Sequence, residues 1–369
     1  MKRKLVIAKK IHLWIGLVSG FVASISGLSG SLQVWQPELL QVLNPEILSV
    51  SGVDTLKEET IHKTASELYN RFGENLAVLN MPYREQESIQ LVLKNAESFY
   101  FHPGTGKLLG EKTISIRFFE SLLNFHRTLL IPNYGKYLVG GSTILFFSLL
   151  LTSGFYLWWR RYQRNPKEGL SLQRNRSKRI FNYDLHKLIG ILFLIPLLIV
   201  AFSGSFFTFM PTYKSVLQIL DAPMKATEEI TKEAFLYLQP EEVLHLTPED
   251  GYKLRAVYFP TKTSGEYRFR YVKKRFISAG LRKTKEIQVN QNYQVTMLTE
   301  YHQSSSSEKI AAQAYPIHIG ETLGIFGRIL VFFTGFIPSI LLITGYRFYR
   351  FRKSNKTVPG NRFNPNRQP

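Results

Sequence analysis

The chain has 369 residues, with 47 Lys and Arg against 27 Asp and Glu, a formal net charge of +20 and no cysteine. This length favours more than one structural unit. Without cysteine the chain can form no disulfide, no thiol nucleophile, no iron–sulfur cluster and no cysteine-ligated zinc site. The high charge could suit a nucleic acid, so its position along the chain has to decide what it means.

Four apolar windows stand out behind a mean hydropathy of −0.08. They are residues 11–35, 137–159, 188–210 and 329–346, and none of them contains a charged residue. A bilayer core about 30 Å thick is crossed by roughly 20 apolar residues in a helix, so each window is long enough or nearly so. Since backbone polar groups must pair internally in lipid, the windows predict four transmembrane helices.

The basic residues gather beside these windows. Residues 1–10, 160–181 and 347–369 together hold 20 of the Lys and Arg residues and a single acid, Glu168. This is the positive-inside pattern, which places both termini in the cytoplasm and the two long inserts outside it. A nucleic-acid-binding surface would instead need basic residues on a folded, aromatic-bearing face, so we expect no nucleic-acid partner.

The predicted organisation follows the chain in eight segments. They are transmembrane helix 1 (1–36), a first insert (37–125), transmembrane helix 2 with its lead-in (126–160), a basic cytoplasmic loop (161–182), transmembrane helix 3 (183–210), a second insert (211–317), transmembrane helix 4 (318–346) and a basic cytoplasmic tail (347–369). Pro196 and Pro338 lie inside helix windows and predict kinks.

Both inserts have the pattern of small α+β modules. The first contains a helical pattern over 55–72 and alternating strands over 88–93 and 98–112, with a Pro/Gly turn after His102. The second repeats this loosely, with a helix over 226–238 and strands within 253–260, 265–274 and 287–298. Residues 304–307 are four serines and predict a flexible loop. The histidines of the inserts are interpreted as surface residues: His62, His102, His245 and His302.

The chain also repeats itself. At an offset of 174 residues, His12 aligns with His186 and carries with it the pairs Gly16/Gly190, Ser29/Ser203 and Gly30/Gly204. At an offset of 192, His126 aligns with His318, with the pairs Gly135/Gly327, Leu138/Leu330 and Thr152/Thr344. Both halves start inside, so the repeat is parallel. The fold predicted is membrane α-helical: a four-transmembrane-helix bundle made of two duplicated helix pairs, with two α+β inserts.

Four histidines define the repeat and lie at the span boundaries. In the predicted topology His12 and His186 lie at the cytoplasmic face, and His126 and His318 near the outer face. Two neutral imidazoles that face each other across a bundle have the right chemistry for the axial ligation of a b-type haem. A bis-His site suits electron transfer because it leaves no open position. We therefore expect about two haems per chain.

Other residues would support these haems. Gly16 and Gly190 follow a ligand histidine by four residues, on the same helix face, and would let a flat macrocycle approach the backbone. The candidates for pairing with the haem propionates are the nearby cations Lys10, Arg179 and Lys187 on the inner side and Arg127, Lys136 and Arg328 on the outer side.

Alternative interpretations of the histidines stay open. A histidine at a membrane interface can extend its polar tip to water or cap a helix. A zinc site is disfavoured because the HxxxH and HExxH spacings are absent. A proton relay would normally add intramembrane acids, and only Asp184 and Glu321 lie near the windows. The same scarcity disfavours a small-solute transporter, and no Walker or dinucleotide motif suggests a nucleotide site.

Several stretches resemble a known family. IHLWIGLVSG, LHKLIG, FHRTLL, HIGETLGIFGR and the insert motif FYFHPGTGKLLG are similar to PepSY-associated transmembrane proteins of bacterial inner membranes, from Lys9 to about Tyr349. The resemblance implies PepSY-like periplasmic inserts and haem-carrying helices, since family members include ferric-siderophore reductases. The insert motif of such proteins usually has an acid where this chain has His102, so no role of that acid transfers. The second insert matches the motif poorly at residues 288–293.

Two functions are therefore expected from different classes. In the first, an oxidoreductase of the bacterial inner membrane takes electrons from a cytoplasmic or quinol donor and reduces an iron(III) chelate or siderophore in the periplasm. In the second, a non-catalytic membrane anchor presents its PepSY-like inserts to a periplasmic protein or peptidase. The sequence leaves the chelate, the donor and homodimer formation open.

Overall fold

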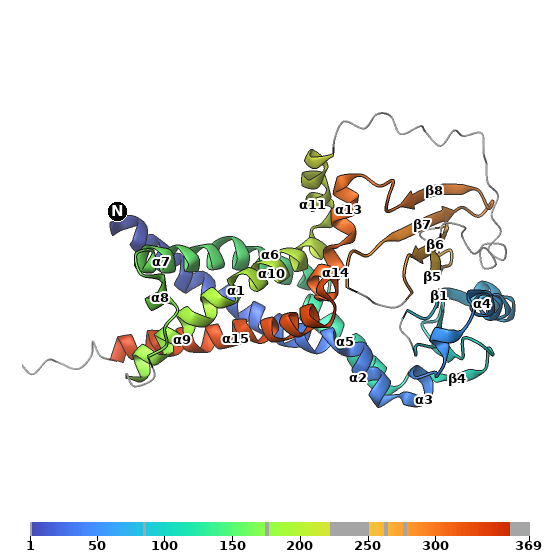
Figure 1. The fold of residues 1–369 in the computed structure, drawn as a ribbon, viewed down its shortest axis with the longest axis horizontal. Helices are drawn as coiled ribbons and strands as arrows, with labels where there is room; N and C mark the ends of the chain where they lie inside the picture. Colours follow the sequence, from blue (N-terminus) through green and yellow to red (C-terminus); the bar gives the residue numbers. More distant parts are fainter. Residues whose placement is uncertain are drawn as a thin grey trace, which may run out of the picture. The chain divides into compact units, whose positions relative to one another are not determined.

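The computed structural model describes residues 2–83, 86–173, 177–221, 251–261, 265–275 and 279–354 (Figure 1). The chain forms two compact units, which are described separately. The helical unit contains Met1–Ser31, Phe125–Ser205 and Phe332–Pro369, and the insert unit contains Leu32–Asn124 and Phe206–Val331. The windows predicted to cross a membrane thus fall mainly in one unit, and the two inserts fall together in the other.

Long apolar helices build the helical unit. They are α1 (Lys2–Val34), α6 (Gly135–Leu145), a π-helix (Phe146–Leu151), α7 (Thr152–Tyr162), α9 (Lys178–Leu192), α10 (Leu194–Thr208) and α15 (Gly324–Ser354). Among the described residues, three continuous helical segments are long and apolar enough to cross a membrane, at Arg3–Val34, Gly135–Tyr162 and Glu321–Arg350. The pair α9 and α10 makes a fourth if it counts as one span.

The third predicted span is broken near its middle. Helices α9 and α10 meet at an angle of 62°. Pro196 lies in the first turn of α10, where it has no N–H to donate, and in a continuous helix its ring would clash with the carbonyl of Leu192. The kink expected at Pro196 is confirmed. Pro338, by contrast, lies inside α15, which continues from Gly324 to Ser354.

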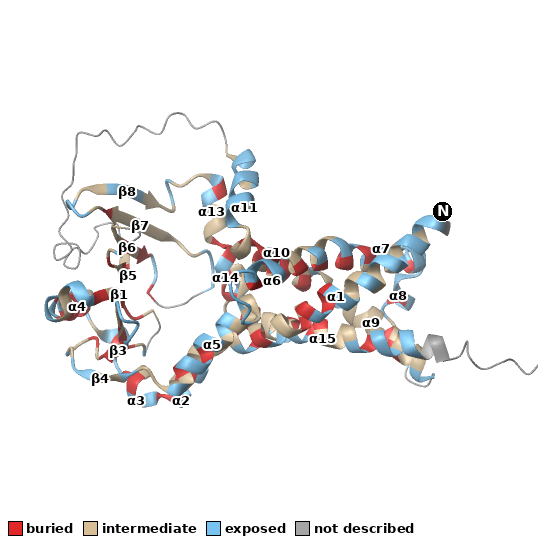
Figure 2. Cartoon of the chain, turned by 180° about the vertical axis from the view of Figure 1, so that it is seen from behind, coloured by how far each residue is buried: buried red, intermediate tan, exposed pale blue. Residues whose placement is uncertain are grey.

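Helices α1 and α15 touch backbone to backbone. A Cβ built on Gly27 would lie 2.3 Å from the carbonyl oxygen of Gly335, and the hydroxyl of Ser31 donates to the carbonyl of Phe332 at 2.8 Å. Small residues at such a crossing allow the close van der Waals contact that holds helices together in lipid. The apolar core of the unit is formed by buried residues of the π-helix, α10 and α15 (buried residues are red in Figure 2): Phe146, Leu150, Leu151, Leu197, Ala201 and Ile337.

A single antiparallel sheet of eight strands organises the insert unit. The strands are β1 (Leu76–Asn80), β2 (Ile89–Leu93), β3 (Ser98–Phe101), β4 (Leu108–Glu111), β5 (Lys253–Tyr258), β6 (Tyr267–Val272), β7 (Thr284–Val289) and β8 (Val295–Glu300), in the order β4-β3-β2-β1-β5-β6-β7-β8. Each insert supplies four strands, and the two halves join where β1 pairs with β5, with Val78 opposite Tyr258 and Asn80 opposite Ala256. Two edges that would otherwise be unpaired are thereby satisfied.

One face of this sheet carries the core of the unit. Helix α4 (Glu58–Phe72) lays Ile61, Ala65 and Leu68 on it, at the i, i+4 and i+7 spacing of a helix face. They pack with strand residues from both inserts, including Leu79, Leu91, Leu254, Phe269 and Val289. The helix predicted over 55–72 is confirmed, and the helix predicted over 226–238 lies outside the described residues.

Two of the expectations for the inserts are wrong. His62 is 2% exposed, because it lies beside Ile61 on the buried side of α4. The serine run is not a loop throughout: α13 (Ser306–Ala312) begins there, and Ser305 caps it, its hydroxyl accepting from the backbone N–H of Glu308 while the Glu308 carboxylate accepts from the N–H of Ser305. The Ser-x-x-Glu capping box was visible in the sequence.

Six further helices and four 3₁₀ turns complete the elements of the described residues. They are α2 (Gln36–Leu43), α3 (Pro45–Leu48), α5 (Ile114–Thr128), α8 (Pro166–Gly169), α11 (Met210–Leu217) and α14 (Ala314–His318), with 3₁₀ turns at Val53–Thr55, Gly73–Asn75, Gln218–Leu220 and Glu321–Leu323. His102 lies in the β3–β4 turn, where its Nδ1 accepts from the N–H of Gly104 at 3.0 Å, and His302 is exposed. His245 lies outside the described residues.

Candidate functional site

Two of the four repeat histidines lie side by side in the helical unit. His12 comes from α1 and His186 from α9, and their ring centres are 6.0 Å apart with the ring planes at 87°. Two metal–imidazole bonds of about 2 Å each, plus about 1 Å from each coordinating nitrogen to its ring centre, require a spacing of about 6 Å. The observed spacing therefore fits two imidazoles that share one metal ion.

Each of these rings is held by the helix that packs against it. His186 Nδ1 lies 3.0 Å from the carbonyl oxygen of Leu341 and 3.2 Å from the hydroxyl of Thr344 on α15. His12 Nδ1 lies 3.3 Å from the carbonyl oxygen of Leu150 and 3.2 Å from the hydroxyl of Ser153. In both cases the carbonyl belongs to residue i and the hydroxyl to residue i+3 of the supporting helix.

His126 is held in the same way by α1. Its Nδ1 lies 2.8 Å from the carbonyl oxygen of Ser26 and 3.3 Å from the hydroxyl of Ser29. Ser29 also lies 3.0 Å from the carbonyl of Ser26 and donates to it. The hydroxyl proton is therefore directed to its own helix, which leaves a lone pair of the hydroxyl oxygen for the imidazole N–H.

These contacts fix which ring nitrogen carries the proton. A backbone carbonyl can only accept a hydrogen bond, so Nδ1 must be the donor in His12, His126 and His186. In a neutral imidazole the other nitrogen, Nε2, is then unprotonated and keeps its lone pair. An Nδ1–H bond to a backbone carbonyl is the usual support of a histidine that binds a metal through Nε2.

A glycine follows the hydroxyl residue in each supporting helix. A Cβ built on Gly154 would lie 3.0 Å from Cε1 of His12, one on Gly345 would lie 3.2 Å from Cε1 of His186, and one on Gly30 would lie 2.8 Å from Cε1 of His126. The missing side chain thus makes room for the ring itself. We call the carbonyl at i, the hydroxyl at i+3 and the glycine at i+4 a histidine cradle.

The cradles correct one residue of the repeat alignment. The offset of 192 pairs Thr152 with Thr344, but Thr152 is exposed and Ser153 is the residue at the His12 ring. The first half therefore holds one extra residue between Leu138 and Ser153. The π-helix Phe146–Leu151 lies within this interval, and a π turn is how an α-helix accommodates one inserted residue. Sequence alignment without gaps could not show this.

The glycines predicted to admit the macrocycle lie against leucines. A Cβ on Gly16 would meet the side chain of Leu150 at 3.3 Å, and one on Gly190 would meet that of Leu341 at 3.7 Å. Leu150 and Leu341 are also the residues whose carbonyls hold the two rings. The two glycines thus serve the helix packing that places the cradles, and their role in haem approach stays a prediction.

The predicted cations divide into engaged and exposed residues. Arg328 is 6% exposed, donates to both carboxylate oxygens of Glu38 and to the carbonyl of Val34, and stacks over Trp35 at 4.5 Å. Its charge is therefore already paired with an acid that the sequence did not single out. The exposed residues are Lys10, Arg127 and Lys136, of which Lys136 lies 4.9 Å above the ring of Tyr137.

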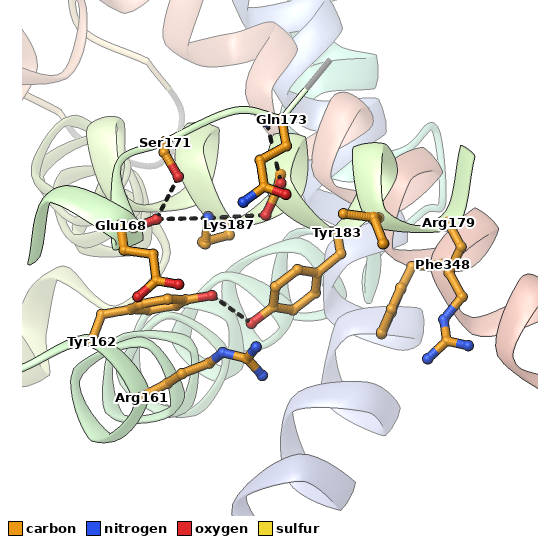
Figure 3. Close-up of a pocket in the computed structure, with 11 residues that line it drawn as sticks. Arg161, Tyr162, Glu168, Ser171, Gln173, Arg179, Tyr183, Lys187 and Phe348 are labelled. Carbon is orange, nitrogen blue, oxygen red and sulfur yellow. Dashed lines mark hydrogen bonds and ion pairs between the residues drawn. The ribbon is translucent and has the colours of Figure 1, made fainter. Parts of the chain in front are cut away.

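The other two cations, Arg179 and Lys187 of α9, line a pocket of about 270 Å³ (Figure 3). Lys187 lies 3.0 Å from the carboxylate of Asp184 and donates to the carbonyl of Glu168. Arg179 stacks over Phe348 at 5.9 Å. The remaining lining residues are Arg161, Tyr162, Ser171, Gln173, Ile180 and Tyr183.

Arg161 also lies over aromatic rings in this pocket, as do Arg179 and Lys187. Its guanidinium lies 5.5 Å from the ring centres of both Tyr162 and Tyr183, whose hydroxyls are 3.3 Å apart (Figure 3). Among the described residues no ion pair involves Arg161 or Arg179, whereas Lys187 is paired with Asp184. Within the lining of this pocket, the two arginines are therefore the cations for which the described residues supply no acidic partner.

His318 belongs to the insert unit and His126 to the helical unit, so their pairing stays a prediction. His318 ends α14, and its ring lies 5.5 Å from that of Phe207. Within the described ranges, no three His, Cys, Asp or Glu side chains gather in an arrangement that would hold a metal ion without a cofactor.

The cradles are what the sequence analysis missed. Their signal was present, because each predicted span contains a Ser-Gly or Thr-Gly pair: Ser29-Gly30, Ser153-Gly154, Ser203-Gly204 and Thr344-Gly345. Such pairs also occur elsewhere in the chain, so only the contacts with the rings distinguish them.

A comparison with known protein families identifies the family of the chain. The family described as the PepSY-associated TM region matches residues 9–352. The chain belongs to the PepSY-associated transmembrane family. No curated protein matches it. The matched residues include the three cradles, most of α1 and α15, the other apolar helices and both inserts, and the match makes the protein a membrane protein of this family.

Proposed function

We propose that this protein is a haem b electron-transfer protein of the bacterial inner membrane that reduces iron(III) chelates in the periplasm. The observation that carries the proposal is the paired placement of His12 and His186, 6.0 Å apart, each with Nδ1 bonded to a carbonyl. That arrangement leaves an Nε2 lone pair on each ring, and the distance between the ring centres is the one expected for two ligands of one iron.

The chain's own residues would hold two haems. His12 and His186 form the inner pair, and His126 and His318 form the outer pair by the sequence repeat. A haem with two axial imidazoles supplies reversible one-electron transfer between Fe(III) and Fe(II) with no open ligand position. Apolar side chains of the helical unit, among them Phe146, Leu150 and Leu151, would shield the inner pair from water.

The proposed topology follows from the basic segments. Four spans, with both termini and residues 161–182 in the cytoplasm, put the pocket lined by Arg161 and Arg179 on the electron-entry side. The donor would be a cytoplasmic protein or a quinol. The inserts would lie in the periplasm and receive the substrate.

The overall reaction adds one electron to each chelated iron(III) and gives iron(II). Hydroxamate, catecholate and carboxylate oxygens bind iron(II) less tightly than iron(III), because the iron(II) ion has a lower charge and is a softer acid. Reduction therefore releases the iron. No proton transfer by a side chain of this chain is needed for that step.

The test is the optical spectrum of the purified full-length protein after haem-replete expression. We expect a reduced-minus-oxidised difference spectrum of low-spin b-type haem and about two haems per chain by pyridine haemochrome. His12→Ala and His186→Ala should each remove one haem, while the exposed control His302→Ala should remove none. Reduction of an iron(III) chelate then tests the acceptor.

Wild-type protein without a Soret band would refute the proposal and favour the alternative, a membrane-anchored PepSY module that binds a periplasmic protein or peptidase. Two haems that survive both inner-pair substitutions would refute the ligand assignment. Haem with normal spectra but no electron transfer to any iron(III) chelate would refute the acceptor.

A further inference from the structure

We propose that the histidine cradles are the positioning elements of the haem sites, and that Ser29, Ser153 and Thr344 act by fixing the tautomer and orientation of the ligand ring. This inference rests on the proposed function and assigns roles to residues that touch the histidines and not the iron.

The same geometry occurs three times on three different supporting helices. Nδ1 lies 2.8–3.3 Å from a carbonyl oxygen and 3.2–3.3 Å from a hydroxyl three residues further on, in α1, α7 and α15. Backbone carbonyls inside helices normally accept from their own helix, so a side chain must come very close to share one. The glycine at i+4 provides that access in every case.

The hydroxyl does more than fill space. Thr344 lies 2.7 Å from the carbonyl of Ile340 and donates to it, and Ser153 lies 3.0 Å from that of Leu150 and donates to it. Their oxygens therefore present lone pairs to Nδ1–H and add a second acceptor to the carbonyl. Two acceptors exclude the tautomer with a bare Nδ1, which is the tautomer unable to offer Nε2 to a metal.

The π-helix belongs to the same device. It follows the segment where the two halves align at an offset of 192. It contains Leu150, and from that residue on the halves align at an offset of 191, with Leu150, Ser153 and Gly154 opposite Leu341, Thr344 and Gly345. Without the wide turn, the extra residue would rotate the cradle by about 100°, one residue of a 3.6-residue turn, away from His12. The first half therefore retains its cradle despite an insertion.

The experiment removes one hydroxyl while keeping side-chain shape. Thr344→Val removes the hydroxyl acceptor at His186, and Thr344→Ser keeps it. Thr152→Val is the matched control, because Thr152 is exposed and is the residue that the ungapped repeat aligns with Thr344. The readouts are the rate of haem transfer to apomyoglobin and the midpoint potential of the inner haem in the full-length protein.

We expect Thr344→Val to weaken haem retention about 10-fold, the lower end of the effect of losing a partner of a metal-ligating histidine, because the Leu341 carbonyl remains. Its midpoint potential should rise, since a less basic imidazole stabilises Fe(III) less. Thr344→Ser and Thr152→Val should match the wild type in both quantities.

Equal retention and equal potential in Thr344→Val and the wild type would overturn the inference while leaving haem binding intact. If instead the wild type carries no haem, the proposed function fails, and ring ¹⁵N NMR of that protein decides the cradle. A protonated Nδ1 on His186 would support it, and a protonated Nε2 would overturn it.

Discussion

The ion pair between Glu58 and Arg275 provides the sharpest stability test in the insert unit. The Arg275 side chain is 2% exposed and donates to both Glu58 carboxylate oxygens and to the carbonyl of Pro82, while Lys253 lies 3.1 Å from the same carboxylate. Glu58→Gln would leave a buried guanidinium without its counter-charge. Breaking a buried pair costs about 3–5 kcal/mol, and because Glu58 is 18% exposed we expect the lower end, about 3 kcal/mol.

This contribution depends on pH with a defined sign. Burial raises the pKa of Glu58, but the hydrogen bonds and charges of Arg275 and Lys253 outweigh it and hold the pKa below its ordinary value. A carboxyl whose folded pKa is depressed stabilises the fold above its unfolded pKa of about 4.3, and the stabilisation is lost as pH falls through the folded pKa. The difference between wild type and Glu58→Gln should therefore be constant at neutral pH and shrink only in acid.

Hydrogen exchange of α4 and β5 in the full-length protein measures this effect. A loss of about 3 kcal/mol corresponds to about 100-fold faster exchange of amides that open with the unit. Glu59→Gln is the matched control, because Glu59 is the exposed neighbour of Glu58 on the same helix. Equal exchange in the two variants would show that the buried pair does not stabilise the unit and would refute the argument.

Three further predictions follow from local geometry. Gly135→Ala should prevent normal folding, because its Cβ would lie 2.0 Å from a backbone carbonyl oxygen, whereas Gly141→Ala, with open space around it, should melt like the wild type. Deletion of Leu149 should convert the π-helix into α-helix and leave haem retention and the melting temperature near the wild-type values. Deletion of Ile340 from α15 should rotate Thr344 away from His186 and lower both quantities. Ser305→Ala should destabilise the first turn of α13 by about 1 kcal/mol, visible as faster exchange confined to that helix.

The apolar windows and charge distribution were readable from sequence because lipid imposes a strong, local rule. A run of about 20 uncharged residues must be helical in a bilayer whatever packs beside it. The structure accordingly has helices over 11–34, 137–159 and 329–346. The window at 188–210 is helical except at Phe193, near Pro196, and at Phe209. The strands of the inserts were recognised for a similar reason, since alternation of apolar and polar residues is set by the pleat.

The burial of His62 and the sharing of one sheet by both inserts were not readable, because they depend on which surfaces meet. The β1–β5 pairing joins residues about 180 positions apart in the chain, and no local pattern specifies such a partner. The ion pair of Arg328 with Glu38 could not be predicted either, because the two residues are 290 positions apart in the chain.

The sequence by itself determined that this is a duplicated membrane protein with two pairs of boundary histidines and extended inserts. The tertiary structure alone decided that His12 and His186 meet, that each ring is held by a carbonyl, a hydroxyl and a glycine, and that Ser153 rather than Thr152 is the residue in contact. The physical reason is that composition and periodicity act within a segment, while a hydrogen bond between helices depends on their rotation. One extra residue changes that rotation by about 100° unless a π turn absorbs it.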